Sequence, residues 1–272
     1  AALPDDGYFA LLQGTGPDLP TRNDLPDVRP SALDTAAWLA ETGDPAAARR
    51  VLAFALRDLR AEGGPWTRER EARLVALGEA LVALGEYRIP QRAAATRVDA
   101  SEQLRTWRLA YPRAWPNLVE PAAAEAGVDP HLAWAVMRRE SAFYPRAISR
   151  SGAQGLMQVM PATWDWLAEL QGEPPADPFA VHANVRYGVH YLGWLDAYFD
   201  GDETLLVASY NRGQGYVGRL WESAEVNRDR DELLHAIDAR ETREYLQNVT
   251  YVQRVYDGLA ALEATLAATP RE

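Results

Sequence analysis

The sequence of 272 residues contains no cysteine. Disulfide bonds, cysteine-based metal sites and cysteine nucleophiles are therefore excluded, but the compartment stays open because many secreted proteins also lack cysteine. Runs of about 18 or more apolar residues are absent too, so the sequence predicts no segment that spans a membrane. Residues 1–6 carry neither the basic stretch nor the apolar core of a secretory signal. We expect either a cytoplasmic protein or a chain from which a signal was removed, and the missing initiator methionine favours the second.

Basic residues are scarce relative to acidic ones. The 28 Lys and Arg side chains face 39 Asp and Glu, which gives a formal net charge of −11. Such a chain repels nucleic acid and anionic lipid unless it carries a local basic patch. The strongest arginine cluster, Arg68, Arg70 and Arg73, alternates with Glu69 and Glu71. We expect this segment to be a solvated helix face, so we expect neither nucleic acid nor a membrane as a partner.

Apolar residues recur at the three- and four-residue spacing of helices through most of the chain. Ser31 is positioned to cap a first helix that stops at Gly43, Asp44-Pro45 to open a second, and Thr67 to open a third that stops at Gly85. Pro90 interrupts the pattern that follows. Further helices are predicted at about 99–109, 117–126, 130–141, 161–170, 180–199, 203–212 and 240–267. Because no β-strand of more than a few residues is evident, the predicted fold is all-α.

Composition divides the chain into three parts. Residues 1–30 are rich in proline and form an extended lead-in. Residues 31–110 are a helical region, and the likeness of its segments 39–44 and 81–86 hints at helical-hairpin repeats. A break at 111–116 precedes a domain over 111–272, where Trp, Tyr, Gly and Asn become frequent in short loops. That composition is more typical of a ligand-binding domain than of a scaffold.

Glu140 is a candidate general acid. It lies one turn after Val136 and Met137 on the predicted helix 130–141, so its carboxylate shares their apolar face. Burial disfavours an ionised carboxylate and raises its pKa, which allows the group to donate a proton near neutral pH. The alternative is a glutamate that is solvated or paired with an arginine.

The segment after this helix has the features of a binding loop. Gly152 and Gly155 allow the backbone to approach another group closely, and Gln158 offers a donor and an acceptor suited to sugar hydroxyls. Met160 supplies a pliable apolar surface, and Pro161 starts the next helix. A tight turn between two helices is the alternative interpretation of the two glycines.

Four short motifs follow one another along the second half of the sequence. They are Glu140-Ser141, Gly155-Leu156-Met157-Gln158, Ser209-Tyr210-Asn211 and Glu241-Thr242-Arg243-Glu244-Tyr245. In this order and at these separations, they resemble the motifs of the soluble lytic transglycosylases over residues 105–262. The resemblance implies a goose-lysozyme-like, all-α catalytic domain in residues 111–272. It also implies that residues 31–110 are a shortened form of the family's α-helical superhelix and linker region.

The resemblance assigns roles to individual positions. Glu140 matches the catalytic acid, Tyr210 the tyrosine that faces it, Glu241 a carboxylate of the groove and Tyr245 a nearby aromatic residue. The positions that line the groove or contact substrate fall on Ser149, Gln158, Met160, Ser209, Tyr210, Asn211, Glu241 and Tyr245. Ser209 replaces the family's usual alanine with little change in volume. Tyr144 stands where asparagine is frequent, which leaves the sugar preference open.

Such enzymes cleave the β-1,4 bond between N-acetylmuramic acid and N-acetylglucosamine without using water. The resemblance implies that Glu140 first protonates the glycosidic oxygen and then accepts the proton of the muramoyl 6-hydroxyl, which closes a 1,6-anhydro ring. Peptidoglycan strands are the implied partner, no cofactor is needed, and the periplasm or cell envelope is the implied location. A hydrolytic lysozyme on the same fold and a non-catalytic wall-binding protein remain as alternatives.

Other chemistry finds less support in the residue pattern. Two-carboxylate glycosidases place their pair about 5–10 Å apart. As a second carboxylate we expect Glu241 before Asp165, interpreted as a surface helix residue, or Asp177, interpreted as a helix start. The four histidines form no i,i+4 pair and no HExxH motif, so we expect no metal site.

The aromatic residues divide into two groups. Four tryptophans occur at helical spacing and are expected in the core: Trp164, Trp166, Trp194 and Trp221. Tyr210 and Tyr216 have glycine-rich, loop-like surroundings and are better candidates for the groove.

Overall fold

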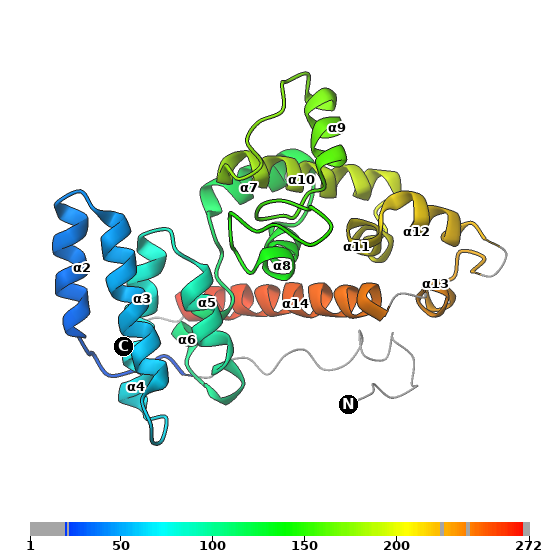
Figure 1. The fold of residues 1–272 in the computed structure, drawn as a ribbon. Helices are drawn as coiled ribbons and strands as arrows, with labels where there is room; N and C mark the ends of the chain where they lie inside the picture. The colour runs from blue at the N-terminus through cyan, green and yellow to red at the C-terminus, as the bar shows by residue number, and fades with distance from the viewer. Residues whose placement is uncertain (1–19, 21, 224–225, 238–239, 269–272) are drawn as a thin grey trace. The chain divides into compact units, whose positions relative to one another are not determined.

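A computed structural model describes residues 20, 22–223, 226–237 and 240–268 of the chain. Every regular element in these ranges is a helix, and strand-like pairing among them is confined to isolated bridges (Figure 1). The predicted all-α fold is therefore confirmed. Contacts divide the described residues into an N-terminal unit, 20–115 with 142–144, and a C-terminal unit, 116–141 with 145–268. Among the described residues, no helix combines the length and apolarity that crossing a membrane requires.

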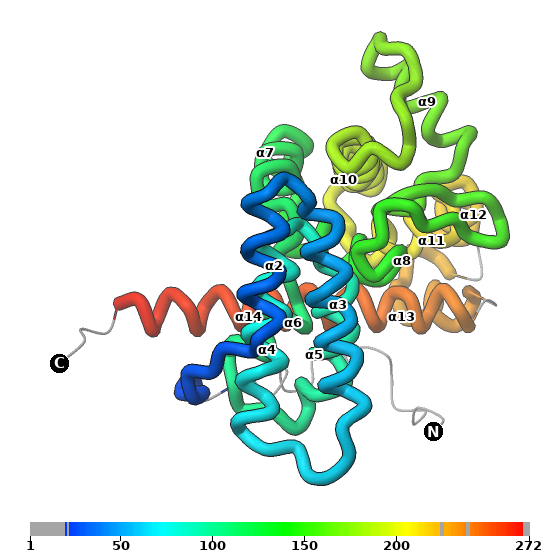
Figure 2. The backbone as a smooth tube through the Cα atoms, turned by 60° about the vertical axis from the view of Figure 1, so that its left-hand side comes forward, coloured from blue at the N-terminus to red at the C-terminus, as the bar shows by residue number. Residues whose placement is uncertain are grey.

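The N-terminal unit is a stack of successive helices. Its elements are α2 (Ser31–Glu41), α3 (Pro45–Ala61), α4 (Arg68–Ala83), α5 (Arg88–Ala95), the 3₁₀ turn η1 (Val98–Ala100) and α6 (Leu104–Ala110). Helices α2 and α3 lie side by side in both views, and α3 packs in turn on α4 (Figure 2). The predicted apolar stripe of α3 forms the core, where Ala48, Leu52, Leu56 and Leu59 are buried.

Two of the three predicted N-terminal helix caps in this unit, Asp44 and Thr67, are confirmed, and the third, Ser31, is wrong. Asp44 accepts a hydrogen bond from Ala47 N at 2.8 Å, and Thr67 accepts one from Arg70 N at 3.2 Å. Ser31 is not a cap, because Pro30 holds the N-cap position and no side chain caps the helix.

The two similar segments, 39–44 and 81–86, form the same helix ending. Gly43 and Gly85 adopt φ angles of +91° and +75°, which glycine reaches without steric cost. The backbone N–H of Asp44 then donates to Leu39 O, and that of Glu86 donates to Leu81 O. Shared capping chemistry is therefore sufficient to explain why these segments resemble each other.

Arg70 contradicts the expectation of a solvated arginine face. Its side chain is buried, and its guanidinium donates to the carbonyl oxygens of Leu59 (2.9 Å) and Glu62 (2.5 Å) at the end of α3. Carbonyls at a helix C-terminus lack partners within the helix, so a buried arginine there satisfies them. Charge alternation alone could not show that a neighbouring helix ends against this position.

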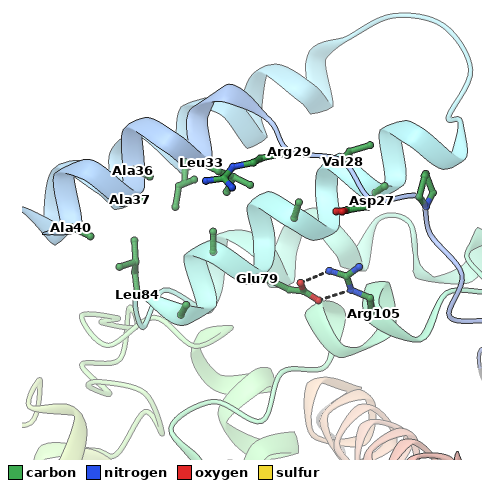
Figure 3. Close-up of a pocket in the computed structure, with 16 residues that line it drawn as sticks. Asp27, Val28, Arg29, Leu33, Ala36, Ala37, Ala40, Glu79, Leu84 and Arg105 are labelled. Atoms are coloured by element: carbon green, nitrogen blue, oxygen red, sulfur yellow. Dashed lines mark hydrogen bonds and ion pairs between the residues drawn. The ribbon is translucent and has the colours of Figure 1, made fainter. Parts of the chain in front are cut away.

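A cavity of about 560 Å³ lies within the N-terminal unit, between α2 and α4 (Figure 3). Alanines of both helices line it, and their short side chains leave the space between the helices incompletely filled. Arg105 closes one edge through hydrogen bonds to both carboxylate oxygens of Glu79.

The C-terminal unit contains the remaining helices. They are α7 (Pro116–Ala126), α8 (Pro130–Ser141), α9 (Pro161–Gln171), α10 (Val181–Tyr198), α11 (Glu203–Arg212), α12 (Gln214–Trp221), α13 (Arg230–Ala236) and α14 (Arg240–Ala268). Helix α7 packs on α10, while α8 and α11 both pack on the long helix α14. Helices α8, α11 and α14 carry most of the residues that the sequence motifs select.

Several predicted boundaries were wrong. The helix predicted at 99–109 is replaced by η1 and α6, and α5 was missed because Pro90 lies in its first turn, where proline is tolerated. Helices α12 and α13 were also missed. Asp177 does not start a helix, since α10 begins at Val181. Of the predicted lead-in, residues 1–19 and 21 lie outside the described residues, and 22–30 contain no helix.

Candidate active site

Helix α8 places Glu140 in its last turn. Asp129 precedes the helix and accepts a hydrogen bond from the backbone N–H of His131 at 2.9 Å, which fixes where the helix begins. The side chains from Leu132 to Met137 are all buried. The apolar face of α8 therefore continues toward Glu140, as its spacing from Val136 and Met137 predicts.

The Glu140 carboxyl contacts the phenol of Tyr245 on α14. Tyr245 Oη donates to Glu140 Oε1 at 2.7 Å, and the tyrosine is buried. Desolvation by burial raises the pKa of Glu140 from 4.5 to about 7, because the ionised form loses its hydration. The hydrogen bond from Tyr245 favours the ionised form and opposes this rise.

Two neighbouring charges act on Glu140 in opposite directions. The guanidinium of Arg139 lowers the pKa of Glu140, whereas the like charge of Glu241 raises it. Arg139 also lies 5.5 Å from the centre of the Tyr245 ring. The resulting group is half protonated near neutral pH, which suits a side chain that must both give and accept a proton.

The loop from 147 to 160 is held together by hydrogen bonds of its own. Ser149 Oγ accepts from Ala153 N at 3.0 Å, and Gln158 Nε2 donates to the carbonyls of Ala147 (3.1 Å) and Gly155 (2.8 Å). Gln158 also has a φ of +50°, which is uncommon for a residue other than glycine. Ser149 and Gln158 therefore build the loop, and the donors of the Gln158 amide are turned inward.

Asn184 on α10 is a residue of this region that the sequence analysis missed. Its buried amide accepts from Met157 N at 2.7 Å and donates to the carbonyls of Gln154 (3.1 Å) and Pro178 (2.8 Å). A side chain at Gly155, where φ is +79°, would place its Cβ 2.1 Å from the Asn184 amide nitrogen. A polar residue on the buried face of a helix was the available signal.

Tyr210 does not donate to Glu140. Its hydroxyl donates to the carbonyl of Met157 at 2.8 Å, on the peptide unit next to the one that Asn184 holds. Burial raises the pKa of Tyr210, and the charge of Glu140 raises it further, so the two groups share an electrostatic environment. Both Tyr210 and Tyr216 lie in helices, α11 and α12, contrary to the loop setting expected for them.

The other two residues of the Ser209-Tyr210-Asn211 motif have structural positions in α11. Ser209 is completely buried, so it cannot contact a glycan in this conformation, and its hydroxyl has no hydrogen-bond partner among the described residues. Asn211 Oδ1 accepts from Thr242 Oγ1 at 2.8 Å, which ties the end of α11 to the first turn of α14. Met160 and Glu241, in contrast, are exposed and available to a ligand.

Aromatic rings extend from Tyr210 along α10. The Tyr210 and Tyr191 ring centres are 5.3 Å apart, and Tyr191 stacks on Trp194 at 6.2 Å. Trp164 is buried, as expected for a core residue, whereas Trp166, Trp194 and Trp221 are partly exposed. Asp165 is exposed on α9, which confirms that it is a surface residue.

Comparison with known families agrees with this arrangement. The family model described as Transglycosylase SLT domain matches residues 117–233. This segment of the chain is similar to a transglycosylase SLT domain. The matched SLT segment contains Glu140, the loop 147–160 and Tyr210, and it ends before α14, where Tyr245 and Glu241 lie.

Curated relatives match between 54% and 61% of this chain. A Haemophilus influenzae protein, provisionally named a soluble lytic murein transglycosylase, is 33% identical over 174 residues, which are 61% of this chain and 29% of that protein. The soluble lytic murein transglycosylase of Escherichia coli K12 is 30% identical over 151 residues, 54% of this chain and 23% of the relative. The chain thus spans less than a third of the length of these two relatives.

A solved structure extends the likeness over more of this chain. It is the X-ray structure of the lytic transglycosylase Slt from Pseudomonas aeruginosa, in an inactive form in which a glutamate is replaced by glutamine. The TM-score is 0.61 at 25% identity, and the match covers 88% of this chain and 39% of that one.

Proposed function

We propose that this chain is a peptidoglycan lytic transglycosylase that cleaves the β-1,4 bond between N-acetylmuramic acid and N-acetylglucosamine. The observation that carries the proposal is the state of Glu140, a desolvated carboxyl with a pKa of about 7 that accepts a hydrogen bond from Tyr245. The curated relatives of this chain are named for action on murein, which supports the substrate class. That substrate belongs to the cell envelope, where we expect the protein to act.

The first step of the proposed reaction uses the protonated form of Glu140. The carboxyl donates its proton to the glycosidic oxygen as the bond to C1 breaks, and positive charge develops on the sugar. Tyr245 holds Oε1 of Glu140 by its hydrogen bond, which leaves the other carboxyl oxygen to carry and deliver the proton. A pKa near the working pH provides a large protonated fraction together with a useful acid strength.

The second step uses the same residue as a base. The Glu140 carboxylate accepts the proton of the muramoyl 6-hydroxyl, whose oxygen then bonds to C1 and closes the 1,6-anhydro ring. After this step the carboxyl is protonated again, so protons balance over the cycle without water. Tyr245 and Arg139 stabilise the transient carboxylate, since both lower the pKa of Glu140.

Peptidoglycan digestion followed by mass spectrometry of the products tests the proposal. Purified sacculi incubated with the protein are expected to release muropeptides that end in 1,6-anhydro-N-acetylmuramic acid. Products with only reducing ends would show that water replaces the 6-hydroxyl, as in a hydrolytic lysozyme. Glycan strands bound but not cleaved would identify a non-catalytic wall-binding protein, and both results would overturn the proposal.

A further inference from the structure

Two helices of the C-terminal unit bring metal-ligating groups together at a distance from Glu140. Asp129 and His131 lie at the start of α8, and Asp257 lies on α14. One ligand atom from each lies within 4.8 Å of the others. His131 and Glu140 are nine residues apart on α8, roughly 14 Å along the helix axis, so this cluster is separate from the proposed reaction.

The ligand atoms of the cluster lie near the spacing that they would have around a small cation, and the shortest contact is a hydrogen bond between His131 and Asp257. His131 Nδ1 lies 2.7 Å from Asp257 Oδ1 and 3.9 Å from Asp129 Oδ1. In a tetrahedral zinc site, with bonds of about 2.0–2.2 Å, neighbouring ligand atoms are about 3.3–3.5 Å apart. The two observed distances lie on either side of this value, so small rotations of the side chains would place all three groups around one ion.

Gln253 on α14 provides an independent sign of a ligand. Its side chain is 8% exposed, and its amide nitrogen donates to Asp129 Oδ2 at 3.3 Å and to Glu203 Oε2 at 3.2 Å. Its amide oxygen has no hydrogen-bond partner among the described residues, and a buried carbonyl without a partner is costly. Rotation of the amide by half a turn would direct this oxygen between the two carboxylates, which is the orientation that a cation favours.

The surrounding charge is negative. Glu203 adds a carboxylate beside Gln253, and Asp129, Asp257 and Asp196 are the acidic side chains that act on it. The backbone N–H of His131 at the start of α8 donates a hydrogen bond to Asp129. Among the described residues, the side-chain oxygen of Gln253 has no such donor.

We propose that Asp129, His131 and Asp257 bind a divalent cation of the zinc class, with Gln253 and Glu203 completing the site. An imidazole beside carboxylates suits zinc or manganese better than calcium, which takes oxygen ligands. The ion ties the starts of α8 and α11 to α14, the helices that also carry Glu140, Tyr210 and Tyr245. Its ligands span residues 129–257, so a search for closely spaced histidines could not find the site.

Zinc binding to the full chain tests the proposal directly. The protein is stripped with a chelator and titrated with Zn²⁺ against a chromophoric zinc indicator. We expect one tightly bound Zn²⁺ per chain and a higher melting temperature with zinc than with EDTA. Asp257→Asn is the main variant because this side chain is 53% exposed and its replacement should leave the fold intact. Asp257→Asn and His131→Gln should each weaken zinc binding at least tenfold.

Matched controls separate this site from adventitious binding. Asp165→Asn on α9 and His182→Gln on α10 change exposed residues of the same types in the same unit and should bind zinc like the wild type. Equal zinc affinity in the wild type and Asp257→Asn, or no saturable binding at all, would overturn the proposal. Tighter binding of Ca²⁺ than of Zn²⁺ would contradict the imidazole ligand. Circular dichroism of each metal-free variant verifies that the helices are intact.

Discussion

Each unit of the molecule contains a glutamate with little or partial exposure to solvent, Glu71 being buried and Glu140 half-buried, and the two carboxyl groups have different surroundings. Glu71 on α4, in the N-terminal unit, is 8% exposed and accepts hydrogen bonds from Thr106 Oγ1 at 2.7 Å and from Ser101 Oγ. Glu140, in the C-terminal unit, receives one hydrogen bond from Tyr245 and has another carboxylate, Glu241, acting on it. Glu71 joins α4 to α6, whereas Glu140 joins α8 to α14.

The comparison shows that burial alone does not make a catalytic acid. Two hydroxyl donors hold the Glu71 carboxyl group, which gives Glu71 a structural role. Desolvation raises the pKa of Glu140 by more than Tyr245 and Arg139 together lower it, so the pKa rises to about 7. The number and charge of the neighbours therefore separate the structural Glu71 from Glu140, the glutamate proposed to react.

Replacing the reactive glutamate should have the largest effect. Glu140→Gln keeps the shape of the side chain but cannot transfer a proton, so turnover of peptidoglycan should fall by about 10³-fold or more. Binding of glycan strands should persist. Release of soluble muropeptides measures turnover, and sedimentation with sacculi measures binding. Turnover within tenfold of the wild type would remove Glu140 from the proposed mechanism.

The same substitution should change how stability depends on pH. Below pH 4, Glu140 is protonated in both the folded and the unfolded chain. Between pH 4.5 and 7 the unfolded chain ionises Glu140 while the folded chain retains the proton, so the wild type loses stability as the pH rises. The loss reaches up to about 3 kcal/mol above pH 7.

Glu140→Gln lacks this loss. Relative to the wild type, its free energy of unfolding should therefore rise by up to about 3 kcal/mol between pH 4 and pH 8. Urea unfolding of both proteins at the two pH values measures the difference. A constant difference between the two proteins would mean that the pKa of Glu140 is the same in the folded and unfolded chain.

The structural glutamate should give the opposite result. Glu71→Gln replaces a carboxyl oxygen that accepts hydrogen bonds from Thr106 and Ser101, so the free energy of unfolding should fall by about 1–3 kcal/mol. Turnover per folded molecule should stay at the wild-type level. Urea unfolding and muropeptide release on the same preparation give both quantities. A loss of turnover in Glu71→Gln without a loss of stability would contradict the structural role of Glu71.

Tyr245→Phe should have the smallest effect, because it removes only the hydrogen bond from Tyr245 to Glu140. Removal of the hydrogen bond that lowers the pKa of Glu140 should raise this pKa further above 7, by up to about one pH unit. The upper limb of the profile of kcat/KM against pH should shift to higher pH. At pH 6, kcat/KM should fall about three- to tenfold, because one hydrogen bond contributes about 1 kcal/mol. A shift of the limb to lower pH would contradict this role.

Sequence patterns predicted the framework of the fold well. The stripe of α3, the cap at Asp44, the start of α9 at Pro161 and the helix that carries Glu140 all agree with the structure. These features depend on contacts within one helix or one turn. Helices α12 and α13 are only eight and seven residues long, too short for an apolar period to become clear.

The surroundings of the site were harder to predict because they are tertiary. The motifs selected Glu140 and Tyr245, but not the hydrogen bond between them across 105 residues. In the sequence, Asn184 is only a polar residue inside a predicted helix. Its three hydrogen-bond partners become known only from the structure. The interpretation of Arg70 as solvated failed for the same reason, since its partners lie on another helix.

A titration of the glutamate carboxyl groups tests the central claim most directly. NMR of protein labelled with ¹³C at the glutamate side-chain carboxyl resolves individual titrations, and comparison with Glu140→Gln assigns the signal of Glu140. The account predicts one carboxyl that titrates near pH 7 and disappears in the variant. A Glu140 signal that titrates near its ordinary value of 4.5 would contradict it.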